Sequence, residues 1–162
     1  MLLRPKYRFQ RITEIPVSFF TEHSFQTVLL DVDNTLTTYH GTEPIEGLET
    51  WLQNLKKNGL TVVIVSNSKE QQIRPFAEKL GLPFVAPGLK PLSHGYRKAR
   101  KKYAFQKKKT VTIGDQLFTD ILGGNLYGIS TVLVTPVLLE TQRSYRIKRW
   151  LENRILRKMK WE

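Results

Sequence analysis

The chain contains no cysteine, which excludes disulfide bonds, thiolate catalysis and zinc sites held by cysteine. It also lacks an apolar run of the ~18 residues that a membrane-spanning helix needs. No apolar segment follows the basic opening MLLRPKYRFQ, so a secretory signal peptide is not predicted. From these absences we expect a cytoplasmic protein, either free or attached peripherally to the inner face of a membrane.

Positive charge, by contrast, is abundant. The net charge is +12, and the 26 Lys and Arg residues are clustered: four lie in residues 4–11, eight in 97–109 and eight in 143–160. Clusters of this kind favour an anionic partner larger than a catalytic pocket, such as a lipid surface, nucleic acid or a ribosome. A solvated surface without a partner is the alternative.

The spacing of apolar residues predicts the fold. The 162 residues, 40% of them hydrophobic, suffice for one domain, and the chain has no internal repeat or low-complexity linker. From residue 27 onward, strand patterns alternate with helical patterns, which predicts an α/β, Rossmann-like fold with three α/β/α layers around a five-stranded parallel sheet. The predicted strands are residues 27–32, 60–65, 83–86, 110–113 and 130–134, and the predicted helices are 46–57, 69–80, 92–103 and 118–127.

Ligands of such sheets bind beyond the carboxyl ends of the strands, so the residues that follow each strand are candidate site residues. Asp31 and Asp33 follow the first strand, and carboxylates two residues apart in extended chain repel unless they share a proton or bind a cation. Ser66 and Asn67 follow the second strand, where a hydroxyl and free N–H groups can bind an anion. Taken singly, all four are also ordinary turn or helix-capping residues.

The next two strand ends carry charged residues as well. Lys90 follows the third strand, in a short loop between Gly88 and Pro91. The fourth strand ends in GDQLFTD, which puts Asp115 at the strand end and Asp120 in the following helix. A surface lysine and a helix-capping aspartate are the ordinary alternatives.

In combination, these residues resemble the four motifs of the haloacid-dehalogenase-like (HAD) superfamily. The superfamily has a DxDxT loop, a Ser or Thr, a Lys and a GDxxxxD-type acidic loop, which stand here as DVDNT, Ser66, Lys90 and GDQLFTD. The resemblance extends from residue 27 to about residue 135. It implies a phosphatase, a phosphoric monoester hydrolase that depends on Mg²⁺.

The resemblance also implies a role for each acid. Asp31 would attack phosphorus and become an aspartyl phosphate, while Asp33 would protonate the leaving oxygen and then activate water. The Mg²⁺ would be held by Asp31, the backbone carbonyl of Asp33, and Asp115, with Asp120 completing or supporting the shell.

The remaining motif residues would bind or orient the phosphoryl group. Ser66, Asn67 and Lys90 would hold its oxygens, and Asn34, Thr35 and Asn67 would orient the site. Asn34 departs from the Gly that many members have there, but Asn tolerates a positive φ. Dehalogenases lack the second acid, so the presence of Asp33 disfavours that chemistry.

The spacing of the motifs leaves no room for a cap domain over the site. This resembles the minimal-cap subclass IIIA, and the DVDNTL loop, the size and the basic tail are most similar to its YqeG-type group, which includes phosphatidylglycerophosphate phosphatases. The implied substrate is a lipid phosphate at an anionic membrane surface. The missing cysteines exclude the zinc-stapled sugar-phosphate members.

The pattern of the C-terminal segment independently indicates a membrane surface. Ile147, Leu151, Ile155 and Met159 recur every four residues among basic residues and tryptophans, a pattern typical of an amphipathic helix on a membrane surface. Alternatively, the apolar stripe packs on the domain and the charges face water. We therefore divide the chain into a basic segment (1–26), a HAD catalytic domain (27–140) and a basic amphipathic helix (141–162).

A second class of function uses the same charges to bind RNA. A nucleic-acid 3′-phosphatase, or an RNA- or ribosome-associated binding module on this scaffold, would take its affinity from phosphate contacts and stack bases on Tyr96, Tyr103 and Phe105. The three histidines show no metal-ligand spacing. The sequence does not indicate an oligomeric state.

Overall fold

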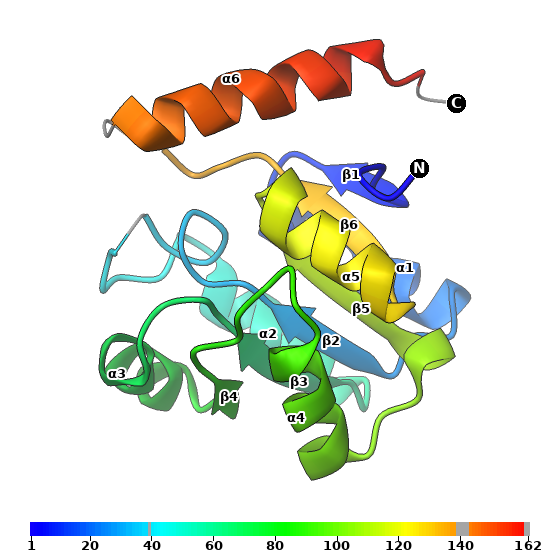
Figure 1. Cartoon of the computed structure of the whole chain (residues 1–162). Helices are drawn as coiled ribbons and strands as arrows, with labels where there is room; N and C mark the ends of the chain where they lie inside the picture. Colours follow the sequence, from blue (N-terminus) through cyan, green and yellow to red (C-terminus); the bar gives the residue numbers. More distant parts are fainter. Residues whose placement is uncertain (39, 139–142, 161–162) are drawn as a thin grey trace.

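A computed structural model describes residues 1–38, 40–138 and 143–160. Its centre is one sheet of parallel strands in the order β1-β6-β5-β2-β3-β4 (Figure 1). The strands are β1 (Tyr7–Phe9), β2 (Thr27–Leu30), β3 (Thr61–Val65), β4 (Phe84–Val85), β5 (Thr110–Gly114) and β6 (Ser130–Val134). The three-layer α/β prediction is confirmed.

Helices cover both faces of this sheet. On one face, α1 and α2 contribute Phe20 and Trp51 to the larger hydrophobic core, and α3 contributes Ile73. On the other face, Tyr96 of α4 and Tyr127 of α5 belong to a second cluster. The helices are α1 (Val17–Glu22), α2 (Leu48–Lys57), α3 (Glu70–Leu80), α4 (His94–Tyr103), α5 (Leu122–Tyr127) and α6 (Arg143–Lys158), with 3₁₀ turns η1 (Ile12–Glu14) and η2 (Lys107–Lys109) and a π-helical turn η3 (Leu117–Ile121).

The sheet has six strands, one more than predicted. The additional strand, β1, pairs in parallel with the edge of β6, with Tyr7 opposite Val132. Sequence reasoning missed it because these three residues are only half-buried or exposed and lie within a basic segment without an apolar run. The segment before residue 27 thus contributes a strand, and through Ile12 and Phe20 it also contributes to the core.

The C-terminal helix α6 crosses the β1–β6 side of the sheet (Figure 1). Ile155 and Leu156 on its domain-facing side pack against Leu117, Ile121 and Leu133. The proposed boundary between residues 140 and 141, and the helical assignment of residues 161–162, lie outside the described residues. Among the residues that the structure describes, none of the helices has the length and apolarity to cross a membrane.

The apolar stripe expected along α6 does not lie on one face. Ile147 and Trp150 are 58% and 57% exposed, whereas Ile155 and Met159 are half-buried. A spacing of four residues advances about 400° around a helix of 3.6 residues per turn, so the stripe winds from the outward side to the domain-facing side. Arg149 and Glu152 are the buried residues of α6.

Candidate active site

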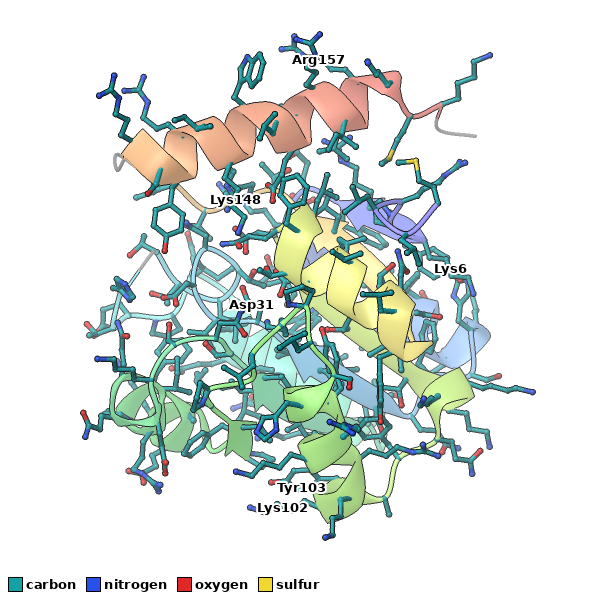
Figure 2. All side chains as sticks on the ribbon, in the orientation of Figure 1. Lys6, Asp31, Lys102, Tyr103, Lys148 and Arg157 are labelled. Atoms are coloured by element: carbon teal, nitrogen blue, oxygen red, sulfur yellow. The ribbon has the colours of Figure 1, made fainter. Side chains whose placement is uncertain are left out.

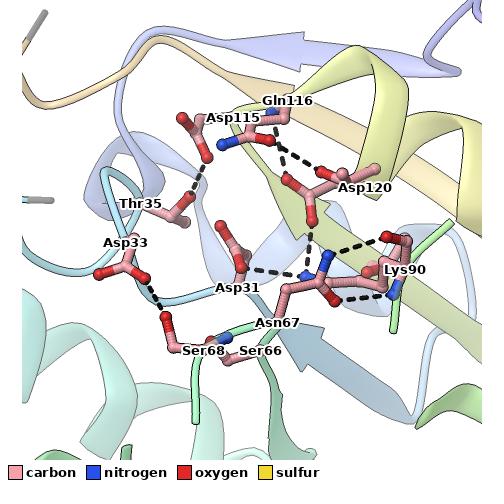
Figure 3. Close-up of polar contacts among 12 residues, drawn as sticks. Asp31, Asp33, Thr35, Ser66, Asn67, Ser68, Lys90, Asp115, Gln116 and Asp120 are labelled. Atoms are coloured by element: carbon pink, nitrogen blue, oxygen red, sulfur yellow. Dashed lines mark hydrogen bonds and ion pairs between the residues drawn. The ribbon is translucent and has the colours of Figure 1, made fainter. Parts of the chain in front are cut away.

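The four motifs meet at the carboxyl edge of the sheet. Because β5, β2, β3 and β4 are neighbours, the loops that follow them converge although they are distant in sequence. Asp31, Ser66, Lys90 and Asp115 each follow one of these strands, and all four are buried. In Figure 3, Lys90 lies between the carboxylates of Asp31 and Asp120, the latter from η3, and the Asp115 carboxylate lies beside Thr35.

The Lys90 ammonium bridges two of the carboxylates. Its Nζ lies 3.0 Å from Oδ1 of Asp31 and 2.7 Å from Oδ1 of Asp120. Burial by itself lowers the pKa of Lys90, but the charges of Asp120 and Asp31 outweigh this effect and raise the pKa above its ordinary value. Lys90 therefore remains charged and offsets part of the negative charge at the site.

The acids themselves form a compact group. Asp31, Asp115 and Asp120 each have a carboxylate oxygen within 4.8 Å of the others. Burial raises the pKa of Asp115 well above its ordinary value, and the nearby Arg149 opposes this shift. Burial and then the charge of Asp31 raise the pKa of Asp120, against the effect of Lys90.

Asp33 points to a different side of the site (Figure 3). Its Oδ2 accepts a 2.6 Å hydrogen bond from the Ser68 hydroxyl, and its Oδ1 accepts a 2.8 Å bond from the backbone N–H of His40. Its carboxylate is not part of the group that Asp31, Asp115 and Asp120 form. Asp33 therefore lines the same cleft as Asp31 but points its carboxylate away from the other acids.

The side chain of Asn67 holds the Lys90 loop. Its Nδ2 donates to the Lys90 carbonyl at 2.8 Å, and its Oδ1 accepts from the Lys90 N–H at 2.7 Å. The hydroxyl of the buried Ser66 accepts from the N–H of Ser68 at 3.2 Å. Asn67 thus fixes the backbone that carries Lys90, and it also lines the cleft.

Asn34 has a positive φ of 58°, as expected of an Asn in the turn after the second acid. Its carbonyl accepts the N–H of Val137 at 3.0 Å. Thr35 is buried, and its hydroxyl donates to Oδ1 of Asp115 at 3.3 Å. Both residues orient the loop that carries the two catalytic candidates.

Residues outside the four motifs complete the cleft. Lys69, at the start of α3, lines it on one side, and Tyr145 and Lys148 of α6 line it on another. Lys148 lies between α6 and the loops around Asp31 (Figure 2), and its Nζ is 2.7 Å from Oε1 of Gln116. Within the described parts of the chain, no cap domain covers the opening, but α6 forms part of its wall.

Sequence reasoning missed the two buried charges of α6. Arg149 forms an ion pair with the carboxylate of Asp115, and its Nη1 donates to the Asp115 carbonyl at 2.7 Å. Glu152 accepts from the N–H of Leu117 at 3.0 Å. No local signal distinguishes Arg149 from the other basic residues of the tail, because the pairing depends on how the helix docks.

The arrangement suits a hard divalent cation. Three clustered carboxylates supply oxygen ligands only, which is the donor type that Mg²⁺ prefers. The buried Lys90 and Ser66 line the same cleft as Asp31 and can bind the oxygens of a phosphoryl group. The geometry therefore fits phosphoryl transfer, in which positioning and charge neutralisation provide most of the catalysis.

Comparison with known proteins agrees with this geometry. The family model described as mitochondrial PGP phosphatase matches residues 1–138. A protein of Bacillus subtilis named "Probable phosphatase YqeG" is 37% identical over 139 residues, which are 86% of this chain and 81% of that protein.

Solved structures show the same fold at low identity. An uncharacterized protein from Listeria monocytogenes has a TM-score of 0.59 at 21% identity, with 74% of this chain and 84% of that chain covered. The cobalt-bound deoxy-D-mannose-octulosonate 8-phosphate phosphatase of Haemophilus influenzae has a TM-score of 0.54 at 15% identity, with 83% and 89% covered.

Proposed function

Because the chain belongs to the PGP phosphatase family of the HAD superfamily and is a phosphoric monoester hydrolase, we propose that it removes the terminal phosphate of phosphatidylglycerophosphate. The products are phosphatidylglycerol and inorganic phosphate. The observation that carries the proposal is the group formed by Asp31, Asp115 and Asp120 with Lys90 at the carboxyl edge of the sheet.

In the proposed reaction, a carboxylate oxygen of Asp31 attacks phosphorus. The bond from phosphorus to the glycerol oxygen breaks, and Asp33 donates a proton to that oxygen. Asp33 then takes a proton from water, which attacks phosphorus, releases phosphate and regenerates Asp31. The hydrogen bonds from Ser68 and His40 hold the Asp33 carboxylate in the cleft but apart from the other acids, on the side where the leaving group would be.

Asp31, Asp115, Asp120 and the backbone carbonyl of Asp33 would hold Mg²⁺. A bound Mg²⁺ would neutralise charge that develops on the phosphoryl oxygens. Ser66 and Lys90 would contact these oxygens, and Asn67 would contribute by fixing the Lys90 backbone.

The rim of the cleft supports a substrate with a second negative charge. Lys69 and Lys148 line the opening in addition to the buried Lys90. Phosphatidylglycerophosphate carries a phosphodiester one glycerol away from the phosphate that is removed, so a lysine at the rim would neutralise it. No cap domain is present among the residues that the structure describes, which would leave space for the lipid chains outside the cleft.

The outward face of α6 supports a membrane surface as the place of reaction. Exposed Ile147 and Trp150 lie there beside the exposed Arg143 and Arg146. An exposed apolar pair with a basic border suits the headgroup region of an anionic bilayer. Arg4 donates to the Lys160 carbonyl at 3.0 Å, so the basic N-terminal segment lies beside the end of this helix.

The basic residues of α4, which could bind nucleic acid, give less support to a reaction at the α6 end of the molecule. Lys102 and Tyr103 lie at the opposite end of the molecule from α6 (Figure 2). Nucleic acid bound there would lie on the opposite side of the molecule from Lys148, the lysine of α6 that lines the cleft. We therefore treat a nucleic-acid phosphatase as an outcome of the test.

The test measures phosphate release from phosphatidylglycerophosphate in mixed micelles, with and without Mg²⁺, beside a 3′-phosphorylated oligonucleotide. We expect Mg²⁺-dependent release from the lipid and its loss in the Asp31→Asn variant. Phosphate release from the oligonucleotide alone would mean that the substrate is a nucleic acid and not the lipid. Retained activity of Asp31→Asn would overturn the assignment of the nucleophile.

A further inference from the structure

Two buried charges of α6 contact the acidic loop of the site, and the mechanism above does not use them. Arg149 is 9% exposed, and Asp115, with which it pairs, is 2% exposed. The guanidinium contacts Asp115 twice, through Nη2 at the carboxylate Oδ2 and through Nη1 at the backbone carbonyl. A planar guanidinium that makes both contacts fixes the side chain and the backbone of Asp115 together.

Glu152 holds the other side of this contact. It lies one turn further along α6, and its Oε2 is 3.0 Å from Nη1 of Arg149. Its Oε1 accepts from the N–H of Leu117 at 3.0 Å, at the start of η3. The first N–H groups of a helical turn have no partner within the turn, so this carboxylate supplies one from outside. Arg149 and Glu152 thus hold the chain on both sides of Gln116.

The contact determines which oxygen of Asp115 is available. Arg149 takes Oδ2, while Oδ1 accepts the weaker 3.3 Å bond from Thr35. Without the guanidinium, the carboxylate could rotate, and it would lie among acids with one positive charge fewer. Replacement of groups that orient metal ligands in this way typically weakens metal binding about 10- to 100-fold.

We propose that Arg149, supported by Glu152, is a positioning residue that holds Asp115 in the orientation required for binding a divalent cation, so that docking of α6 is a condition for metal binding. The inference rests on the metal site in the proposed function. It adds residues from outside the matched family region, which ends at residue 138. The ligands thus come from the catalytic domain, but their orientation comes from the C-terminal helix.

A purely structural ion pair predicts something different. In that case, removal of Arg149 lowers the stability of the protein and leaves the Mg²⁺ affinity of the folded fraction unchanged. A competing ion pair predicts the opposite sign, because an arginine that occupies a metal ligand in the metal-free protein would weaken Mg²⁺ binding in the wild type. The Mg²⁺ dissociation constant separates these three roles.

The experiment is isothermal titration of Mg²⁺ into wild-type protein and into the Arg149→Ala, Arg149→Lys and Glu152→Gln variants. We expect Arg149→Ala to weaken Mg²⁺ binding about 10- to 100-fold. Arg149→Lys should be intermediate, because one ammonium cannot reproduce the two-point contact. Arg157→Ala is the matched control: Arg157 is exposed, lies on the same helix and points away from the domain (Figure 2), so its binding should equal that of the wild type.

Unchanged or tighter Mg²⁺ binding by folded Arg149→Ala would overturn the proposal, as would a wild-type protein that binds no Mg²⁺. If Arg149→Ala does not fold, Arg149→Lys decides, since it keeps the positive charge but loses the two-point contact with Asp115. Weaker Mg²⁺ binding by this variant supports the proposal, and unchanged binding refutes it. Because titration needs no substrate, failure of the lipid assay would leave this result intact.

Discussion

At the scale of single residues, Lys90 links two of the three clustered carboxylates. It is buried, and its ammonium lies within 3.0 Å of both Asp31 and Asp120. Exchange for a neutral side chain would leave two buried carboxylates close together without a cation between them. Such a change affects catalysis and stability through the same electrostatic interaction.

We therefore expect Lys90→Met to lower kcat by about 10²–10³. In the absence of Mg²⁺ it should also lower the free energy of unfolding by about 3–5 kcal/mol, the usual cost of breaking a buried ion pair. Saturating Mg²⁺ should restore part of this stability. Urea unfolding with and without Mg²⁺ tests this expectation, with Lys101→Met, at an exposed position of α4, as the control. Equal stability of Lys90→Met and wild-type protein without Mg²⁺ would contradict it.

Substitution of Asp33 can separate proton transfer from metal binding. Its carboxylate bonds to Ser68 and to the His40 N–H, apart from the Asp31–Asp115–Asp120 group. We expect Asp33→Asn to reduce turnover by about 10²–10⁴, the usual contribution of a general acid and base, while Mg²⁺ binding is kept. The Asp115→Asn variant should lose both turnover and Mg²⁺ binding. Phosphate release and Mg²⁺ titration on the two variants test this, and loss of Mg²⁺ binding by Asp33→Asn would assign its carboxylate to the metal.

At the scale of elements, the end of β5 depends on a glycine. A Cβ added to Gly114 would overlap the carboxyl group of Asp120. The Asp120 Oδ2 accepts from the N–H of Gln116 at 3.1 Å, so this carboxyl group folds back against the end of the strand. A glycine here permits that close approach.

Gly114→Ala should therefore displace Asp120 and weaken Mg²⁺ binding about 10- to 100-fold. Gly128→Ala provides the matched control, because its added Cβ meets no atom within 4 Å and its φ of +87° causes only local strain. That control should lose about 1–2 kcal/mol of stability and keep its Mg²⁺ affinity. Mg²⁺ titration and thermal unfolding distinguish the two effects. Equal Mg²⁺ affinity of the two variants would mean that Asp120 tolerates displacement.

At the scale of the whole molecule, helix α6 contacts the active site with one side and exposes apolar residues on the other. One side of the helix carries Arg149 and Glu152 against the acidic loop, and the opposite side exposes Ile147 and Trp150. Deletion of the helix would affect both sides at once. Substitutions on the exposed side alone separate membrane binding from catalysis.

We expect the double variant Ile147→Ser and Trp150→Ser to bind vesicles that contain phosphatidylglycerol at least ~10-fold more weakly, since each apolar side chain contributes about 1.5–3 kcal/mol when fully buried. Turnover of a soluble phosphate ester should not change. Vesicle sedimentation measures the first quantity, with Lys102→Ala at the far end of the molecule as the control. Undiminished vesicle binding by the double variant would show that another surface contacts the lipid.

The sequence by itself determined the central sheet and the polar residues that follow its strands. Runs such as residues 28–30 and 62–65 are buried and apolar, and each is followed by the residue that enters the site. Parallel strands bring their carboxyl ends to one edge, so Asp31, Ser66, Lys90 and Asp115 had to meet. These features follow from local patterns and could be predicted.

Only the tertiary structure decided the edge strand β1, the rotation of α6 and the partners of its charges. Three half-buried or exposed residues in a basic segment give β1 no local pattern, and it forms because β6 offers an unpaired edge. Arg149 lies 34 residues from Asp115 and resembles every other basic residue of the tail in sequence. Its role depends on which side of α6 faces the domain, and packing of Ile155 and Leu156 against Leu117 and Ile121 sets that rotation.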